Sequence, residues 1–201
     1  MKQSTKRFSD QLEQWLKRPG PKTIGDITQT FGEKAYAVTI LLLMIIPALP
    51  LPTGGITHVF EVFTIILSLP VVVGCRSFWM PGFIARRQLG NVTTGKLIPA
   101  IMKIVRRLER FSRPRGRLFM QALPIRVITA IVIIGLAVAA ALAPPFSGLD
   151  TFPALGAVII TLGIILDDIL FVIIGIVLGI TGIGLVIFLG AQAVHLIHHL
   201  L

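Results

Sequence analysis

Residues 169–194 read ILFVIIGIVLGITGIGLVIFLGAQAV, a stretch that contains no Asp, Glu, Lys or Arg. Residues 127–149, VITAIVIIGLAVAAALAPPFSGL, are equally free of charge. About 20 apolar residues in a helix cross the roughly 30 Å hydrocarbon core of a bilayer. We therefore predict an all-α, polytopic membrane protein.

The composition of the whole chain agrees with those two stretches. Of 201 residues, 54% are hydrophobic and 14% are charged, and the mean hydropathy is +0.87. Soluble domains carry about 25% charged residues. The composition therefore excludes an ordinary soluble protein.

The positive charge is concentrated next to the apolar stretches. The formal net charge is +10, and residues 1–34 and 76–117 together hold 18 of the 19 Lys and Arg residues. Positive residues beside membrane spans are retained in the cytoplasm, where anionic lipid attracts them. We expect both blocks, and the amino terminus, to be cytoplasmic in a bacterial inner membrane, with no nucleic-acid partner and no cleavable signal peptide. The single cysteine, Cys75, excludes an intrachain disulfide.

Two clusters of proline and glycine interrupt the apolar sequence. The first, residues 50–55, separates the apolar runs 35–49 and 57–75, and the second, residues 144–150, follows the run 126–143. Proline removes a backbone donor and glycine adds backbone freedom, so neither cluster stays helical. Residues 35–49 would form a helix only about 22 Å long. Such helices either begin in the membrane interface or form re-entrant hairpins, and both alternatives are open.

The two halves of the chain resemble each other. Leu12-Glu13 corresponds to Leu108-Glu109, and the break at Pro50 corresponds to the break at Pro144. We predict an internal duplication, in which each half contains an amphipathic interfacial helix and a Pro/Gly-broken helical hairpin. Duplicated transporter folds place their binding sites at such interrupted segments. The predicted parts are a cytoplasmic amphipathic segment, a first membrane hairpin, a basic interfacial segment and a second membrane region of about three helices, at residues 1–34, 35–75, 76–123 and 124–201.

Two short amphipathic helices are predicted before the first apolar run. Phe8, Leu12, Trp15 and Leu16 recur at helical spacing, so they lie on one face. A second helix follows Thr23, a residue type that caps helix amino termini.

A third amphipathic helix is predicted inside the basic segment. Its apolar stripe consists of Leu97, Ile101, Ile104, Leu108 and Phe111, and its basic stripe of Lys103, Arg106, Arg107 and Arg110. This division suits a helix lying in the membrane interface, with the basic residues on anionic lipid head groups. A cytoplasmic helix packed on its own protein explains the pattern equally well.

His58 and Glu61 are the residues most suited to chemistry. They stand three apart at the start of the helix after the first break, with Thr57 and Thr64 near the same face. A glutamate in a membrane helix indicates a functional site, and a nearby histidine could share its proton. The alternative is that both residues lie idle among the head groups. Asp150 is predicted to cap the next helix, and Asp167-Asp168 to form an aqueous turn.

The predicted binding site comprises the polar and helix-breaking residues of both interruptions: Pro50, Pro52, Gly54, Gly55, His58, Glu61, Pro145, Gly148 and Asp150. No nucleophile, P-loop or metal-protease motif occurs, so we predict no enzyme, catalytic residue, metal or cofactor. His195, His198 and His199 are interpreted as a terminal tail. Gly175 and Gly179 form a small face for close helix packing, and a homo-oligomer is left open.

The chain resembles the ExoD-like family of exopolysaccharide-synthesis membrane proteins over about residues 22–185. The residues that carry the resemblance are Gly32-Glu33-Lys34, Pro50-Leu51-Pro52-x-Gly54-Gly55, Gly74-x-Arg76, Trp79-x-Pro81, Arg86-Arg87, Leu108-Glu109-Arg110, Pro114-Arg115 and Pro145-Phe146-x-Gly148. His58 and Glu61 depart from the family pattern, in which apolar residues follow the first break. The resemblance implies a bacterial inner-membrane protein linked to exopolysaccharide production.

Three functional hypotheses follow. The first is a small transporter or facilitator of a polysaccharide or lipid-linked intermediate, with its site at the two breaks. The second is a scaffold that binds anionic lipid or partner enzymes through its basic helices. The third, a lipid head-group enzyme, has the least support because no acid/base pair or metal motif is evident.

Overall fold

The protein is all-α in a computed structural model of the chain. The model describes residues 7–20, 22–50, 55–75, 82–86, 88, 90, 94–95, 98–112, 116, 122–144 and 147–200, without the side chains of residues 24, 83–84 and 190–200. Its helices are α1 (Phe8–Lys17), α2 (Ile24–Phe31), the 3-10 turn η1 (Gly32–Lys34), α3 (Ala35–Met44), α4 (Ile56–Val72), α5 (Gly82–Ala85), α6 (Ile98–Phe111), α8 (Leu123–Ala141), α9 (Thr151–Leu166) and α10 (Ile169–Leu200).

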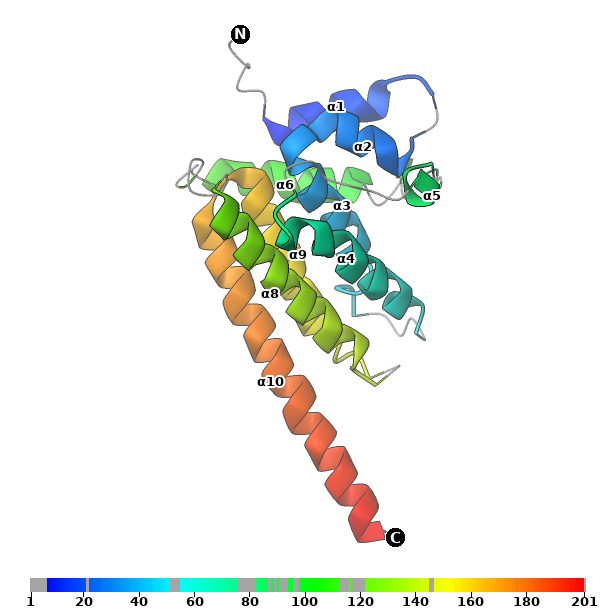
Figure 1. Cartoon of the computed structure of the whole chain (residues 1–201), viewed down its shortest axis with the longest axis vertical. Helices are drawn as coiled ribbons and strands as arrows, with labels where there is room; N and C mark the ends of the chain where they lie inside the picture. Colours follow the sequence, from blue (N-terminus) through cyan, green and yellow to red (C-terminus); the bar gives the residue numbers. More distant parts are fainter. Residues whose placement is uncertain are drawn as a thin grey trace.

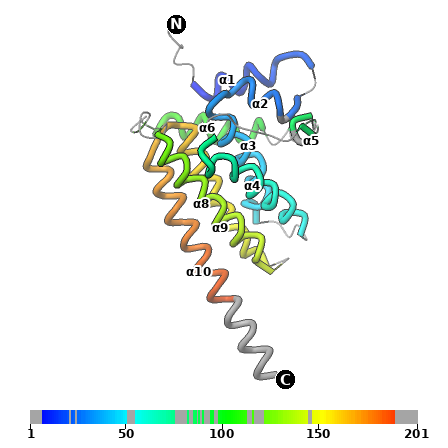
Figure 2. The backbone as a smooth tube through the Cα atoms, in the orientation of Figure 1, coloured from blue at the N-terminus to red at the C-terminus, as the bar shows by residue number. Residues whose placement is uncertain are grey.

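The short helices gather at one end of the molecule. Helices α1, α2, α5 and α6 lie across the ends of the longer helices, and we call this the basic end (Figure 1). The α3–α4 and α8–α9 hairpins extend from it in the same direction. The helix ends that flank the two breaks are at the opposite side (Figure 2). Both basic blocks therefore approach the bundle from the same end.

The predicted amphipathic helices are present. The face containing Phe8, Leu12 and Trp15 is buried, and Leu16 is half-buried. Helix α2 begins at the predicted cap: the backbone N–H of Asp26 donates to Thr23 Oγ1, and the N–H of Thr23 donates to Asp26 Oδ2. This reciprocal capping box fixes the direction in which the chain enters α2.

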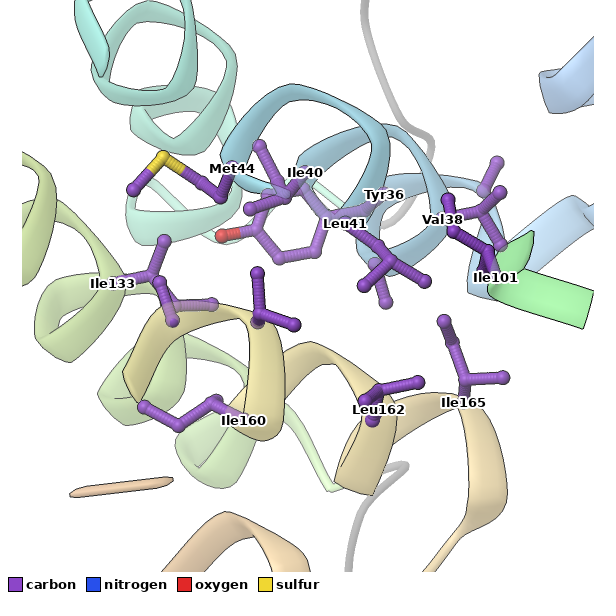
Figure 3. Close-up of a cluster of buried hydrophobic side chains, with 14 of the residues drawn as sticks. Tyr36, Val38, Ile40, Leu41, Met44, Ile101, Ile133, Ile160, Leu162 and Ile165 are labelled. Atoms are coloured by element: carbon purple, nitrogen blue, oxygen red, sulfur yellow. The ribbon is translucent and has the colours of Figure 1, made fainter. Parts of the chain in front are cut away.

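The two hairpins interlock. Helix α3 packs on α9, and α4 packs on α8. Each helix of the α3–α4 hairpin therefore contacts one helix of the α8–α9 hairpin. Figure 3 shows Tyr36, Ile40 and Met44 of α3 among isoleucines of α8 and α9. These side chains are at most 6% exposed. The core thus joins the first half of the chain to the second.

Glycines let α9 and α10 approach until their backbones touch. A Cβ added to Gly156 would lie 2.6 Å from the Cα of Gly179, and one added to Gly175 would lie 2.7 Å from the backbone N of Ile160. Neither distance is tolerated by real side chains. The small face of α10 therefore packs on α9 of the same chain.

Two helices are long and apolar enough to cross a membrane, Leu123–Ala141 and Ile169–Leu189, while α4 and α9 are apolar but shorter. Only 33% and 22% of the two long segments are buried. Large apolar side chains are exposed on three helices: Ile56, Val59, Val62, Ile66 and Leu69 of α4, Ile128, Ile131 and Val138 of α8, and Ile173, Ile174, Val177 and Ile180 of α10. Soluble proteins rarely expose so large an apolar surface, which indicates a membrane protein.

The predicted turn at Asp167-Asp168 exists but is not wholly aqueous. Asp167 ends α9 in a left-handed conformation, with φ of 55°. Asp168 is only 1% exposed, and its carboxylate accepts hydrogen bonds from the Leu170 N–H and the Ser112 hydroxyl. Its burial corrects the expectation that both aspartates are solvated. Asp168 accepts a hydrogen bond from an N–H group in the first turn of α10 and another from Ser112, at the end of α6.

Candidate functional site

Helix α4 has its polar side chains inside and its apolar side chains outside. Thr57, Glu61, Thr64 and Ser68 are all buried, at 2% exposure or less. Their spacing of four, three and four residues places them on one face, which is turned toward the neighbouring helices. The exposed apolar residues occupy the other side of α4. This is the reverse of a soluble amphipathic helix and is typical of a membrane helix that lines a functional interior.

Glu61 and His58 are in direct contact near the start of this face. His58 Nδ1 lies 2.8 Å from Glu61 Oε2, and the two side chains are 32% and 0% exposed. The second carboxylate oxygen, Oε1, has no hydrogen-bond partner within the described part of the structure. An unpaired buried polar atom costs about 1–3 kcal/mol. Glu61 is therefore a candidate site residue at the start of α4.

The remainder of the polar face reaches α3. The Tyr36 hydroxyl donates to Ser68 Oγ at 3.0 Å, and Ser68 Oγ donates to the Thr64 carbonyl at 2.7 Å. The Thr64 hydroxyl has no partner among the described residues. Buried hydroxyls thus run from Glu61 toward the basic end of the bundle.

A cavity of about 50 Å³ lies at that end. It is lined by Glu33, Lys34, Tyr36, Val71, Arg126, Thr129, Ile164 and Asp167. Lys34 donates to the Ile165 carbonyl at 2.6 Å and to Asp167 Oδ2 at 2.8 Å. A cation at the carboxyl end of a helix is favoured by the unpaired carbonyls there. Lys34 therefore stabilises the end of α9 while it borders the cavity.

The described residues of the two breaks are turn residues. Gly55, with φ of 86°, precedes α4, and Gly148 has φ of 68°. A Cβ on Gly148 would meet no atom within 4 Å, so its backbone conformation, not crowding, requires glycine. Pro50 is exposed. The predicted site residues Pro52, Gly54 and Pro145 lie outside the described residues.

Asp150 does not form the predicted side-chain cap of α9. It directly precedes the helix, but it has helical backbone angles (φ −63°, ψ −26°) and its side chain makes no cap hydrogen bond. A capping residue needs an extended backbone to turn its side chain toward the first N–H groups. Instead, the Asp150 carboxylate lies within electrostatic range of Glu61.

The basic stripe of α6 is exposed, as Lys103, Arg106, Arg107 and Arg110 all face outward. Arg106 donates to Glu13 Oε2 of α1 at 2.7 Å. The apolar stripe divides into two parts: Ile101 is buried against the protein, whereas Ile104 and Phe111 are 49% and 76% exposed. Helix α6 therefore packs on its own protein with one face and leaves apolar side chains beside its arginines.

A family model described as "Exopolysaccharide synthesis, ExoD" matches residues 8–188. The chain belongs to the ExoD family. This finding confirms the resemblance seen in the sequence and links the chain to exopolysaccharide synthesis. Together with the two apolar helices, ExoD-family membership indicates a membrane protein.

Two proteins are similar in sequence to this ExoD-family chain, at low identity. An uncharacterized protein of Synechocystis sp. is 23% identical over 165 residues, which cover 81% of this chain and 77% of that protein. Protein ExoD of Rhizobium meliloti is 29% identical over 96 residues, which cover 46% of this chain and 38% of that protein. No solved structure matches the chain.

Two candidate site residues of the ExoD-family chain, Ser68 and Tyr36, escaped the sequence analysis. Ser68 continues the spacing of Thr57, Glu61 and Thr64, so extending the pattern by one more turn could have found it. Tyr36 could not have been found, because it joins the polar face from another helix. The sequence offers no signal for such a tertiary contact.

Proposed function

We propose that this chain is a small membrane transporter or facilitator for a polysaccharide or lipid-linked intermediate in exopolysaccharide synthesis. Its site is the start of α4, beside the first break. The observation that carries the proposal is Glu61, a fully buried carboxylate in contact with His58 and with one oxygen unpaired among the described residues. Buried ionisable residues in membrane helices mark ion and solute pathways. In this proposal Glu61 carries the coupling proton.

The orientation in the membrane is also proposed. The basic end contains α1 and α6, which carry Lys17, Lys103, Arg106, Arg107 and Arg110, so it faces the cytoplasm. Helix α10 starts at this end, directly after Asp168, and leads away from it (Figure 1). The amino terminus is therefore cytoplasmic, and the chain is multi-pass.

The position of the breaks along α10 indicates their depth in the membrane. A Cβ on Gly182 would lie 2.8 Å from Phe152 Cβ, so Gly182 is level with the start of α9. Gly182 is about 20 Å along the helix axis from Ile169, and the charge-free part of α10, residues 169–194, is about 39 Å long. The start of α9 is then level with about the middle of the charge-free part of α10. This favours re-entrant hairpins, whose irregular backbone needs protein or a water-filled cavity around it.

Reciprocal contacts support an internal duplication with parallel repeats. The duplication pairs α1 with α6, α3 with α8, and α4 with α9. Exchanging the halves converts the α4–α8 contact into the α9–α3 contact, and both contacts occur. The matched glutamates behave likewise: Glu13 of α1 pairs with Arg106 of α6, and Glu109 of α6 accepts from Ser9 of α1. A pseudo-two-fold axis along the membrane normal describes this arrangement.

The test is solute-driven proton movement in proteoliposomes. Lipid-linked or soluble oligosaccharide is added on one side, and internal pH and solute uptake are recorded together. Glu61→Gln should retain folding but lose proton movement, and Thr161→Val, a change to a buried hydroxyl away from the site, should behave as wild type. If Glu61→Gln supports normal proton-coupled uptake, or no candidate solute moves in the wild type, the transporter proposal is wrong.

The second candidate is a scaffold that binds anionic lipid through α6. The exposed Ile104 and Phe111 beside the arginines of α6 favour it. A scaffold needs no buried carboxylate. Polysaccharide output per unit of membrane-inserted protein should then be unchanged in Glu61→Gln and should fall when Arg107 and Arg110 are replaced by Gln. The transporter proposal instead expects polysaccharide output to fall more in Glu61→Gln than in the arginine variants.

A further inference from the structure

We infer that the buried hydroxyls of α4 and α3 form a proton path from the cavity at the basic end to Glu61, in the order Tyr36, Ser68, Thr64. The inference rests on the proposed function, because it assigns the coupling ion and its route. His58, on the break side of Glu61, gives a separate entrance. One carboxylate is then reached from two directions by different groups.

The first part of the path joins the cavity to α4. Tyr36 and Val71 both line the cavity, and Tyr36 donates to Ser68 Oγ at 3.0 Å. Tyr36 is 6% exposed and Ser68 is fully buried. Tyr36 therefore stands between the cavity and the interior. A hydroxyl suits this position because it can donate one proton while it accepts another.

The second part of the path crosses two turns of α4. Residues three or four apart on a helix have Cβ atoms about 5–6 Å from each other, and Ser68, Thr64 and Glu61 have this spacing. Thr64 Oγ1 and Glu61 Oε1 have no hydrogen-bond partner within the described residues. Threonine in a helix divides between two rotamers, so the Thr64 hydroxyl has more than one position open to it. The proposed transfer takes place between these two oxygens, which belong to residues one turn apart on α4.

The charged groups near each end of the path differ. Glu61 contacts His58 on its own helix and is within electrostatic range of Asp150, directly before α9. The cavity end is bordered by two cations and two carboxylates, Lys34, Arg126, Glu33 and Asp167. The carboxylates offer a proton-collecting surface at the basic end, and the hydroxyls carry no charge into the apolar interior.

Proton transfer along the path is balanced. A hydronium ion in the cavity gives a proton to the Tyr36 oxygen as Tyr36 gives its own proton to Ser68, and the hydronium ion becomes water. The Ser68 hydroxyl then turns from the Thr64 carbonyl, to which it donates in the structure, and passes a proton to Thr64 Oγ1. Thr64 passes one to the Glu61 carboxylate, which becomes a neutral acid. Each hydroxyl ends with one proton, and the net change is one proton moved from the cavity to Glu61. Release toward the break occurs through His58, which accepts the proton from Glu61.

The experiment measures the protonation of Glu61 from each side. Full-length protein is placed in liposomes sorted for one orientation, and an acid pulse is applied on one side. The infrared carbonyl band of the protonated acid is followed, and its loss in Glu61→Gln assigns it. With the pulse at the basic end, Tyr36→Phe and Ser68→Ala should each slow the appearance of the band by roughly 100-fold. This is the lower end of the effect of a positioned proton donor. With the pulse on the break side, only His58→Ala should slow it.

Two variants serve as controls. Thr39→Val and Thr161→Val also remove buried hydroxyls, but each of these hydroxyls donates to a carbonyl of its own helix, α3 or α9, and neither belongs to the proposed path. Both controls should protonate Glu61 at the wild-type rate. Unchanged rates in Tyr36→Phe and Ser68→Ala, or equal slowing in the controls, overturn the path. If the path is confirmed but no solute moves with the proton, the transporter proposal fails and the path stands.

Discussion

Lys34 Nζ lies 2.8 Å from Asp167 Oδ2, which joins the start of α3 to the turn between α9 and α10 across 133 residues of sequence. The two side chains are 34% and 14% exposed. Within the described residues, this ion pair and the Arg106–Glu13 pair join the two halves of the chain. The pair of Lys34 and Asp167 closes the bundle at the basic end.

Removing this ion pair should destabilise the bundle. Lys34→Met leaves Asp167 and the Ile165 carbonyl without their donor, and we expect a loss of about 1–3 kcal/mol of unfolding free energy. Thermal unfolding in detergent measures it, with Asp167→Asn and the double variant completing a cycle. Independent, additive effects of the two single changes would show that the ion pair contributes nothing.

Gly156 should tolerate no side chain. Gly156→Ala places a Cβ against the backbone of Gly179, so α9 and α10 must separate, at a cost of about 1–3 kcal/mol. Gly135 of α8 and Gly184 of α10 have no atom within 4 Å of an added Cβ. Alanine at either of these control positions should be neutral or should raise the unfolding temperature. Equal effects at all three positions would contradict the close approach of the two helices.

Glu109 should matter more than Glu13, although the two are matched in the repeat. Glu109 accepts from the Ser9 N–H at 3.0 Å and from the Ser9 hydroxyl at 2.5 Å. Glu109→Ala should cost about 1–3 kcal/mol because the buried Ser9 loses both acceptors. Glu13 lies on the surface, where ion pairs contribute little. Chemical unfolding of Glu109→Ala and Glu13→Ala compares them, and a larger loss for Glu13→Ala would refute this ranking.

The contribution of Glu13 should depend on pH. Hydrogen bonds from Lys17 and Arg106 hold the pKa of Glu13 below its ordinary value. A lowered pKa stabilises the fold above the ordinary carboxyl pKa, and this stabilisation disappears as pH falls through the lowered value. The unfolding temperatures of wild type and Glu13→Gln should therefore differ slightly at neutral pH and coincide in acid. A difference that grows in acid would have the wrong sign.

Cysteine labelling tests orientation and depth together. In a Cys75→Ala background, cysteines at Lys17 and Arg107 should react with an impermeant reagent only from the cytoplasmic side. A cysteine at Ser147, an exposed residue of the second break, should react poorly from outside if the hairpin is re-entrant. A cysteine added at the carboxyl end of α10 is the positive control. Equal labelling of Ser147→Cys and this control would favour an aqueous turn.

The exposed residues of α6 should contact lipid. Spin labels at Ile104 and Phe111 should be reached by oxygen, which concentrates in lipid, and a label at Lys103 should be reached by a water-soluble relaxant. Among charge changes, Arg107→Gln and Arg110→Gln should each weaken attraction to anionic lipid by about 1 kcal/mol. Arg106→Gln should have less effect because Glu13 already pairs with Arg106. Water-like accessibility at all three labels would remove the interfacial interpretation.

Local periodicity explains what could be predicted from the sequence. The faces of α1 and α2, the cap at Thr23, and the contact between His58 and Glu61 depend on residues one to eight positions apart, where helix geometry alone decides which side chains meet. The family resemblance and the all-α class follow from equally local features.

Contacts between distant residues explain what could not be predicted. The bond from Tyr36 to Ser68, the ion pair of Lys34, and the burial of Asp168 all depend on how the hairpins pack. Asp150 was misread because its residue type suits a cap, whereas its backbone angles, set by the turn, do not. Residue type indicates what a side chain can do, and tertiary geometry decides whether it does so.

The glycine contacts between α9 and α10 determine which parts of the molecule can move. Gly156, Gly163 and Gly182 bring α10 against α9 along the whole length of α9, through backbone and first side-chain atoms. Sliding or rotating one helix against the other would make their backbones clash, so the two helices behave as one rigid unit. A carrier has to open alternately to two sides. If the chain is the transporter proposed above, the moving element is the α3–α4 hairpin, which contains Glu61, and it turns against the fixed pair of α9 and α10.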